Sequence, residues 1–324
     1  MGLSTVRRRP GRTGMGAVLA VVMTIGGGVV AGSPAWAFHK QIHDQITEAG
    51  LAHQDVGRWS LRQFLDAATS PDGDEDDLAK AHCDNADHVR RENNGGKAYP
   101  KDKDWRDLQI YNCAKYALDH YIKALELASG LADVKGVPVS TPMDGNCRFD
   151  QRPGRLKCDV IEHFGRAMHA IEDFHAHSNW TDHSDPAQRE ITLTNPYGLA
   201  KAERFPVWTI LSDHARQGGR NFTKEVVANL LPHDLLTGCF ADKVEGDHDP
   251  QDCTDRVTHA TLSKDEADSP RSGIRVDGKT NRDRAVEAAS TEVAAQVAAF
   301  VADLENRYSP VRAKGIVTAL FQDK

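Results

Sequence analysis

Apolar residues recur every three or four positions along most of this chain, which is the spacing that places them on one face of a helix. Alternating β-branched runs, which would indicate strands, are nearly absent. The pattern predicts an all-α protein with helices near residues 40–54, 59–69, 105–130, 157–178, 198–217, 222–231 and 281–306. The last segment is rich in Ala, with Val and Phe at helical intervals, and is expected to form a core helix.

Residues 1–35 have the layout of a signal peptide. Four arginines between residues 7 and 12 precede an apolar run from Met15 to about Ala31, which is too short and too rich in Gly for a membrane span. Cleavage after Ala35 or after Ala37 satisfies the small-residue rule, and the first of these makes Trp36 the N-terminal residue. We therefore predict a secreted protein whose mature chain has no transmembrane segment, exported by the general or the twin-arginine route.

Residues 36–324 contain no linker, repeat or low-complexity block, so we expect them to form a single helical domain. Removal of residues 1–35 changes the formal net charge from −7 to −11. Such a charge disfavours loose binding to nucleic acid or to anionic membranes through a broad basic patch. The local motifs of serine hydrolases, of the common metalloproteases and of P-loop proteins are absent, so those classes have no support.

The chain has six cysteines and no CxxC pair that would suggest a thiolate metal site. An even number of cysteines in an exported chain indicates a disulfide framework. Six cysteines allow fifteen different pairings. Proximity in the sequence predicts the pairs Cys147 with Cys158 and Cys239 with Cys253, leaving Cys83 with Cys113.

One predicted helix carries an unusual polar stripe within EHFGRAMHAIEDFHAHSNW, residues 162–180. At about 100° per residue, His169, Asp173 and His177 share one helix face with Glu162 and Arg166. A solvated face is one interpretation, but such faces usually carry Lys and Glu rather than several imidazoles. The i, i+4 spacing lets an imidazole and a carboxylate converge on a cation. Ligands of this kind, without thiolate, favour zinc.

More ligands are available in two other segments. FHKQIHDQITEAGL, residues 38–51, contributes His39 and His43. SPDGDEDDLAKAHCDNADH, residues 70–88, contributes Asp72, His82 and His88. We expect ligands from the three segments to share one centre.

Together these segments resemble the exported zinc-dependent phospholipase C superfamily, which also contains the fungal single-strand-specific zinc nucleases. HAIEDFHAHSNW is most similar to the HET-C-related branch, and HATLSKD, residues 259–265, is similar to the tail of that domain. The resemblance covers residues 36 to about 306 and implies an all-helical domain with two or three zinc ions. The metal ligands that it implies are Trp36, through its amine and carbonyl, His43, Asp72, His82, His169, and Asp173, which bridges two ions.

The sequence departs from the superfamily pattern at the third metal. Phospholipase C and the nucleases have a His six residues after the bridging Asp and a distant His-x-x-x-acid pair, whereas this chain has His175 and His177. We pair His177 with Asp182, as HET-C-like sequences suggest. The further candidates are His183 and His214, and the third site is absent if none completes it.

The expected function is a zinc-dependent phosphodiesterase that hydrolyses phospholipids with a metal-activated hydroxide, in peripheral contact with a membrane. Asp173 bridges the metals, and Asp72 is a ligand that also orients or deprotonates the attacking water. One alternative is a single-strand nuclease, with Trp180, Tyr197 and Trp208 as stacking platforms for bases. Another is a non-catalytic, metal-stabilised exported protein of the HET-C type, whose metal sites would be closed.

Overall fold

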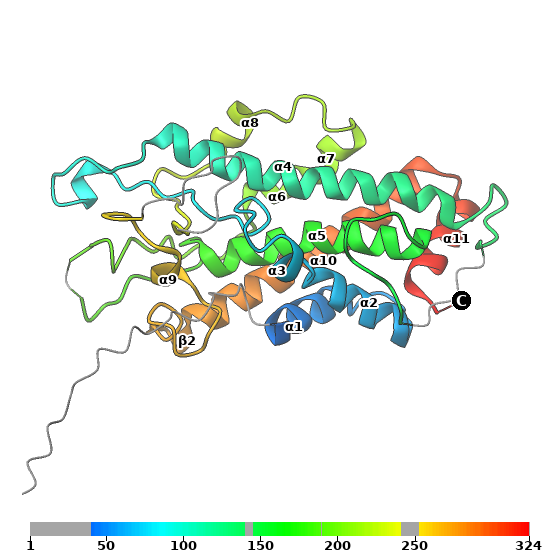
Figure 1. Cartoon of the computed structure of the whole chain (residues 1–324), viewed down its shortest axis with the longest axis horizontal. Helices are drawn as coiled ribbons and strands as arrows, with labels where there is room; N and C mark the ends of the chain where they lie inside the picture. The colour runs from blue at the N-terminus through cyan, green and yellow to red at the C-terminus, as the bar shows by residue number, and fades with distance from the viewer. Residues whose placement is uncertain (1–39, 140–144, 189, 241–252, 324) are drawn as a thin grey trace, which may run out of the picture. The chain divides into compact units, whose positions relative to one another are not determined.

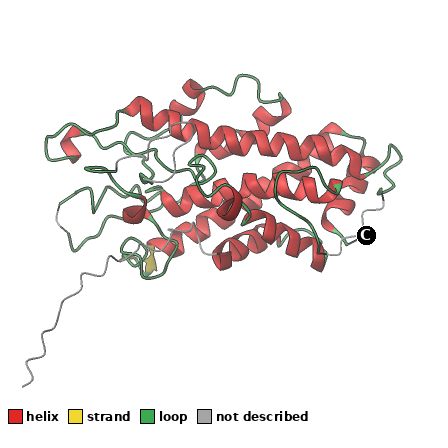
Figure 2. Cartoon of the chain, in the orientation of Figure 1, coloured by secondary structure: helices red, strands yellow, loops and turns green. Residues whose placement is uncertain are grey.

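The computed structural model describes residues 40–139, 145–188, 190–240 and 253–323, and these are mainly helical (Figures 1 and 2). The all-α prediction is confirmed: the only strands in these ranges are β1 (Arg275–Val276) and β2 (Lys279–Thr280), which pair antiparallel. The longer helices are α1 (Lys40–Leu51), α2 (Arg58–Ala68), α4 (Lys103–Ala128), α5 (Leu156–His177), α10 (Asn281–Arg307) and α11 (Pro310–Phe321). The short helices are α3 (Pro71–Asp74), α6 (Pro206–Thr209), α7 (Leu211–Arg216), α8 (Lys224–Ala228), α9 (His259–Leu262), and the 3-10 turns η1 (Arg91–Asn93) and η2 (Ser129–Leu131).

Two helix predictions need correction. The segment 198–217 is not one helix, because residues 198–205 are irregular and Pro206 starts α6 at the first position where a proline is tolerated. Helix α11 was not predicted, although Pro310 likewise occupies its first turn. The first error concerns a short element, since α6 has four residues, whereas α11 is as long as α1, with twelve.

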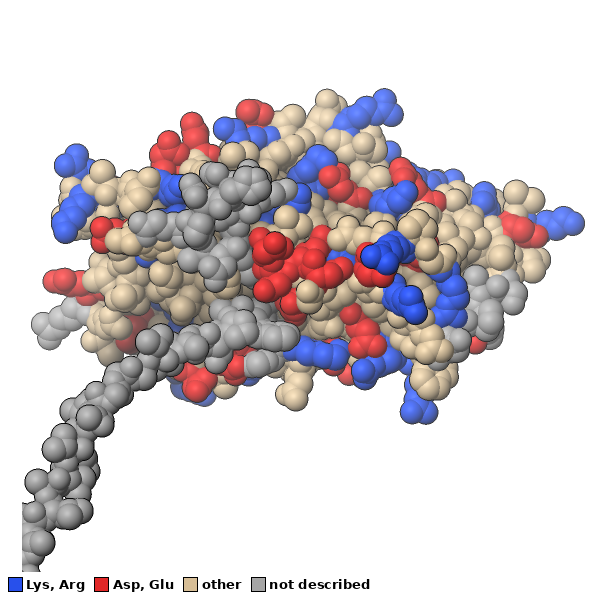
Figure 3. Space-filling view, viewed as in Figure 1, with Lys and Arg blue, Asp and Glu red and all other residues tan. Residues whose placement is uncertain are grey.

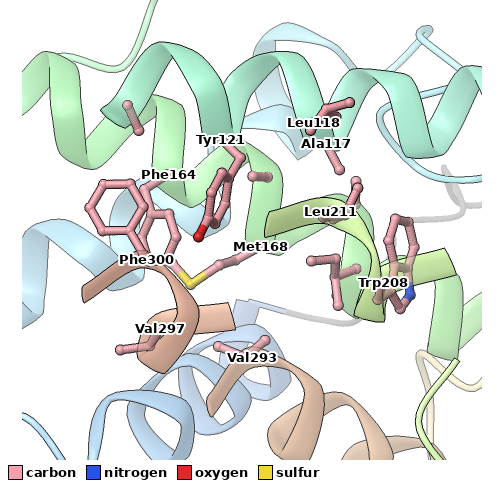
Figure 4. Close-up of a cluster of buried hydrophobic side chains, with 14 of the residues drawn as sticks. Ala117, Leu118, Tyr121, Phe164, Met168, Trp208, Leu211, Val293, Val297 and Phe300 are labelled. Carbon is pink, nitrogen blue, oxygen red and sulfur yellow. The ribbon is translucent and has the colours of Figure 1, made fainter. Parts of the chain in front are cut away.

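Helix α5 runs through the middle of the helical assembly (Figure 1). It packs against α4, α2 and α10, and less extensively against α1 and α11. The apolar residues of α5 meet those of α4 and α10 in the core shown in Figure 4. The labelled side chains of this cluster are Ala117, Leu118, Tyr121, Phe164, Met168, Trp208, Leu211, Val293, Val297 and Phe300.

Helices α2 and α5 approach each other closely at Gly165. A Cβ at that position would lie only 2.6 Å from the Cβ of Ala67, a distance that packed carbon atoms do not tolerate. The missing side chain therefore lets the end of α2 lie directly against α5. This contact positions the chain that continues through α3, where Asp72 lies.

Helix α10 begins with a capping box in which Thr280 and Asp283 each bind the other's backbone N–H. By length and composition alone it could also cross a membrane, a property that it shares with core helices of soluble proteins. Its buried stripe packs in the core, which confirms the prediction of a core-forming helix. All described residues belong to one compact unit.

The three disulfides predicted from proximity in the sequence are present, and they are compatible with an extracellular protein. Cys83–Cys113 attaches the irregular segment 78–90 to α4. Cys147–Cys158 attaches a loop to the start of α5. Cys239–Cys253 lies next to α9, where the carbonyl of Cys239 accepts from the backbone N–H of His259. Two of these bridges thus hold segments that carry histidines.

Candidate metal centre

The polar stripe of α5 is buried, so it is not a solvated helix face. Glu162, Arg166, His169, Asp173 and His177 are all at most 2% exposed. Buried charged and polar groups are costly unless each is paired or bound to an ion. The first turns of the stripe are paired within the protein, because Arg166 binds Glu162 on α5 and Asp74 and Glu75 near α3. The rest of the stripe belongs to two clusters of imidazoles and carboxylates.

The first cluster gathers His43 of α1, Asp72 of α3, His82 of the segment 78–90, and His169 and Asp173 of α5. Asp173 is at its centre. Its Oδ2 lies 2.8 Å from Nδ1 of His82 and 3.0 Å from Nε2 of His169, while its Oδ1 lies 3.3 Å from Nε2 of His43. Asp72 completes the ring, with its oxygens 3.6–3.9 Å from the same three nitrogens. The structure therefore brings together these five residues, all of which the sequence motifs indicated.

The outer nitrogen of each imidazole in the first cluster is held by an acceptor. Nδ1 of His169 lies 2.8 Å from the carbonyl of Ala68, and Nε2 of His82 lies 3.1 Å from the carbonyl of Glu75. Because a carbonyl can only accept, these nitrogens carry the protons. Nδ1 of His43 is bound by the carboxylate of Glu172. The inner nitrogens consequently can present lone pairs to a cation bound between them and the two aspartates, as metal-ligating histidines do.

This inner ring consists of acceptors that face one another. Oδ1 of Asp72 and Oδ1 of Asp173 are buried and have no hydrogen-bond partner in the described structure. In a tetrahedral zinc site with bonds of about 2.0–2.2 Å, neighbouring ligand atoms lie roughly 3.3–3.6 Å apart. The observed separations of 2.8–3.9 Å bracket that range. The residues therefore place nitrogen and oxygen ligands at the spacing of a divalent-cation site, and a cation there would satisfy the two carboxylate oxygens that meet no hydrogen-bond partner among the described residues.

The charges in the metal-free protein show the same need for a cation. Burial alone disfavours the imidazolium of His43, but the hydrogen bonds and negative charges of Asp173 and Glu172 outweigh it and raise the pKa well above its usual value. Burial would raise the pKa of Asp173, but the charges of His169 and His177 hold it well below its usual range. Without a metal, a proton on His43 supplies positive charge that the carboxylates require.

A second cluster lies one turn further along α5, around His177. It contains His177, His259 of α9, Asp84 and Asp265, and the two imidazole rings lie 4.2 Å apart. Nδ1 of His177 lies 3.0 Å from the carbonyl of His82, and Nδ1 of His259 lies 3.1 Å from Asp84. These nitrogens therefore carry the protons, and Asp84 is an outer carboxylate.

The two Nε2 atoms of the second cluster face Asp265, at 3.3 Å from His177 and 3.4 Å from His259. Neither nitrogen has a hydrogen-bond partner in the described structure, nor does Oδ1 of Asp265, whose other oxygen accepts from Ser263. Asp84 and the two imidazoles also have ligand atoms within 4.8 Å of one another. Because the Nδ1 atoms of both imidazoles carry protons, these residues can bind an ion only through Nε2. The Nε2 atoms face Asp265, so an ion is better placed between them and Asp265 than beside Asp84.

The pairing of His177 with Asp182 is incorrect. Asp182 is fully buried and forms ion pairs with Lys264 at 3.2 Å and Arg271 at 2.8 Å, which leaves no charge to share with a metal. Neither His183 nor His214 joins a cluster: His183 uses its backbone to bind Asn281, and His214 faces the carbonyl of Arg220.

The other candidate residues lie elsewhere. His88 is directed to the carbonyl of Lys101. His175, between the two cluster residues of α5, points to the opposite side of the helix. Burial lowers its pKa to about 3, with a contribution from the charge of Lys264. Trp36 and His39 lie outside the described residues.

Sequence reasoning missed Glu172, Asp84, His259 and Asp265. Glu172 directly precedes Asp173, and the segment HATLSKD already contains His259 and Asp265, six residues apart. That spacing matches no simple ligand motif, so only the fold shows that both converge on His177. The two clusters are connected, because the carbonyl of His82 in the first accepts from His177 in the second.

Comparison with models of protein families, with curated proteins and with solved structures finds no match to this chain. What the protein does is therefore argued from the geometry of these clusters.

Proposed function

We propose that this protein is an exported zinc-dependent phosphodiesterase that hydrolyses phospholipids, as a phospholipase C does. The observation that carries the proposal is the first cluster, where three imidazole nitrogens and two buried carboxylates converge at the spacing of metal ligands. The three disulfides support export, because such bonds persist in oxidising compartments. The layout of residues 1–35 as a signal peptide supports it as well.

Zinc is the metal that this set of donors favours. The ligands combine imidazole with carboxylate, and all six cysteines are in disulfides, so no thiolate is available. The two oxygens of Asp173 are directed to different imidazoles, Oδ1 to His43 and Oδ2 to His82 and His169. This division favours a bridging role for Asp173 between two ions. The second cluster provides the ligands for a third.

Zinc bound there supplies Lewis-acid chemistry, since it polarises a phosphoryl oxygen and makes water acidic enough to attack as hydroxide at neutral pH. The protein's own residues hold the ligands in place. Glu172 fixes the ring of His43 and is itself bound by the hydroxyl of Thr47 at 2.8 Å. Asp72 is the most exposed residue of the first cluster, at 10% of its side chain, so a substrate phosphate is expected to approach along it.

The surface beside Asp72 favours a substrate with a cationic group. Acidic side chains gather over α3 in the face shown in Figure 3, and Asp74, Asp76 and Asp77 are exposed there. A polyanionic nucleic acid is repelled by such a surface, whereas a zwitterionic phospholipid brings a positive headgroup. Trp180 and Trp208 are at most 2% exposed and pack against Phe205, so they are not available as stacking platforms. Both observations favour phospholipid over nucleic acid.

A metal-stabilised protein without catalysis is the second candidate. The observation in its favour is burial: His43, His82, His169 and Asp173 are all 0% exposed. Structural zinc sites are saturated by protein ligands, whereas catalytic sites keep an open position. The two candidates therefore differ in whether the bound metal is reached by a substrate.

The deciding experiment begins with natively exported protein. Zinc content per chain and the N-terminal residue are measured on one sample, followed by turnover of a chromogenic phosphocholine ester and of single-stranded DNA. Two or three zinc ions with ester turnover support the phospholipase proposal. Zinc without turnover of either substrate supports the non-catalytic candidate, DNA turnover alone indicates a nuclease, and absence of zinc refutes the metal centre. An extension preceding Trp36 should remove one zinc ion if its amine is a ligand.

A matched pair of variants tests the site itself. Asp72→Asn removes one carboxylate from the first cluster, and Asp77→Asn removes the same charge from the neighbouring acidic surface. We expect Asp72→Asn to lower kcat/KM for the ester by at least about tenfold, and Asp77→Asn to have little effect. Equal losses in both variants would show that surface charge, rather than metal ligation, controls the rate.

A further inference from the structure

A separate cavity of about 220 Å³ lies against the opposite side of α5 from the two metal clusters. His175 forms part of its wall. Because His175 is two residues from both Asp173 and His177, a rotation of about 200° around the helix separates it from each, and its side chain points away from theirs. The cavity also contacts the loop at residues 200–204 and the first turns of α10. Its charged lining residues are Lys201, Glu203, Arg204, Lys279, Arg284 and Glu287, of which Arg204 is paired with Glu292 outside the lining. His175 and Thr181 add further polar groups.

Three of the lining residues have buried polar atoms without a hydrogen-bond partner in the part of the chain that the structure describes. Within those ranges both ring nitrogens of His175 lack a partner, although the residue is only 1% exposed. Oγ1 of Thr181, in a residue that is 2% exposed, lacks one as well, and so does Nε of Arg284. Buried polar groups are nearly always satisfied in native proteins, so atoms that share one cavity indicate a missing polar ligand.

The charges around the cavity indicate that this ligand is an anion. Lys201 is paired with Glu203 at 3.0 Å, and Lys279 is paired with Glu287. Arg284 takes part in no ion pair among the described residues, and its terminal nitrogen donates to the carbonyl of Val276 at 2.7 Å. It therefore leaves one uncompensated positive charge on the cavity wall.

The interior behind the cavity adds to this positive charge. Next to Thr181, the carboxylate of Asp182 is shared by Lys264 and Arg271, so two buried cations face one anion. Both terminal nitrogens of Arg271 also lack hydrogen-bond partners in the described structure. Two cations around one carboxylate make the potential at this end of α5 more positive.

We propose that this cavity is a phosphate-binding site, separate from the metal centre. Arg284 and Thr181 donate to phosphate oxygens, and one nitrogen of His175 does the same. The second nitrogen of His175 accepts, and either a protonated phosphate oxygen or a neighbouring hydroxyl of a phosphate ester supplies that proton. A phosphate group, with three or more acceptor oxygens, matches these donors better than a carboxylate, which has two. The site does not depend on the proposed phosphodiesterase activity.

The test is calorimetric titration of the metal-loaded mature protein with inorganic phosphate, glycerol 3-phosphate and acetate. Arg284→Gln should weaken phosphate binding roughly ten- to a hundredfold, the usual cost of a lost charged donor. Thr181→Val, which keeps the shape of the side chain, should weaken it severalfold. Arg282→Gln, which removes a charge from the same helix outside the cavity lining, serves as the matched control and should bind as the wild type does.

Zinc content and ester turnover of Arg284→Gln should equal those of the wild type, which separates this site from the metal centre. Tighter binding of glycerol 3-phosphate than of inorganic phosphate would identify a phosphate ester as the ligand, and the reverse would identify free phosphate. Undiminished phosphate binding in both Arg284→Gln and Thr181→Val would overturn the proposal, because the phosphate would then be bound at the metals. Acetate binding as tight as phosphate binding would overturn the assignment of the ligand.

Discussion

Replacing Asp173 with Asn tests the metal centre most directly. The substitution preserves the shape of the side chain but removes the charge that three imidazoles face, at distances of 2.8, 3.0 and 3.3 Å. Four-ligand zinc sites in small domains contribute about 10–16 kcal/mol, so one ligand accounts for roughly 2.5–4 kcal/mol. Asp173→Asn should therefore weaken zinc binding by a factor of about 10² to 10³.

The same change in affinity should appear in thermal stability. At a fixed excess of zinc, a hundredfold weaker affinity removes about 2.7 kcal/mol of stabilisation. For a domain of about 290 residues, with an unfolding entropy of roughly 2.1 cal/mol/K per residue, the melting temperature should fall by about 4–5 °C. The quantity to measure is the rise in Tm between chelator and zinc, together with zinc content after dialysis against a competing chelator. That difference isolates the metal from other effects of the substitution.

Asp182→Asn is the matched control. Asp182 is as deeply buried as Asp173, but it pairs with Lys264 and Arg271 and faces neither cluster. Breaking this pair should lower Tm in chelator and in zinc alike, by leaving buried cations without a partner. The zinc-induced rise should remain. If Asp173→Asn kept both its zinc and the full rise in Tm, the first cluster would not be a metal site.

Three further predictions follow from the same geometry. Glu172→Gln removes the carboxylate that orients the ring of His43, so it should weaken zinc binding about 10- to 100-fold in chelator competition. Unchanged zinc affinity would show that the ring of His43 is held in place without Glu172. Gly165→Ala should cost roughly 1–3 kcal/mol in chemical denaturation, with or without zinc, because its Cβ would overlap that of Ala67; a stabilised variant would contradict the packing described here. The pKa of His43 is raised in the metal-free protein, so its protonated form stabilises the fold. This stability is fully present below the unfolded pKa of about 6.5 and is lost as the pH rises through the folded pKa. Zinc must displace that proton, so affinity should fall as pH falls and binding should release protons, as titration in buffers of different ionisation enthalpy would show; binding without proton release would contradict the raised pKa.

Much of the fold could be predicted because its signals are local. The periodicity of α5 and α10, the cap of α10 and the small loops closed by Cys147–Cys158 and Cys239–Cys253 each depend on residues close together in the chain. The same holds for the pair His169 and Asp173, whose spacing of four residues places both on one helix face. The helices with clear periodicity were accordingly predicted correctly, whereas the four-residue helix α6 and the C-terminal helix α11 were not.

The second cluster shows what local signals leave undecided. Asp84, His177 and the segment that carries both His259 and Asp265 come from three separate parts of the chain, and no spacing between them indicates that they meet. The disulfides of Cys83 and Cys239 hold the segments that carry Asp84 and His259, so long-range covalent and packing constraints decide the meeting point. For the same reason the sequence suggested Asp182, the nearest acid after His177.

The sequence by itself determined which residue types line one face of α5, because helical geometry converts spacing directly into direction. It did not determine whether that face is solvated or buried, since this depends on which elements cover it. Only the tertiary structure decided that α1, α3 and the segment 78–90 enclose the stripe, which turns His169 and Asp173 from polar surface residues into charged groups that require a cation. Helical geometry directs His175 away from Asp173 and His177, which lie two residues before and after it. Only the structure showed that this side of α5 borders a separate cavity.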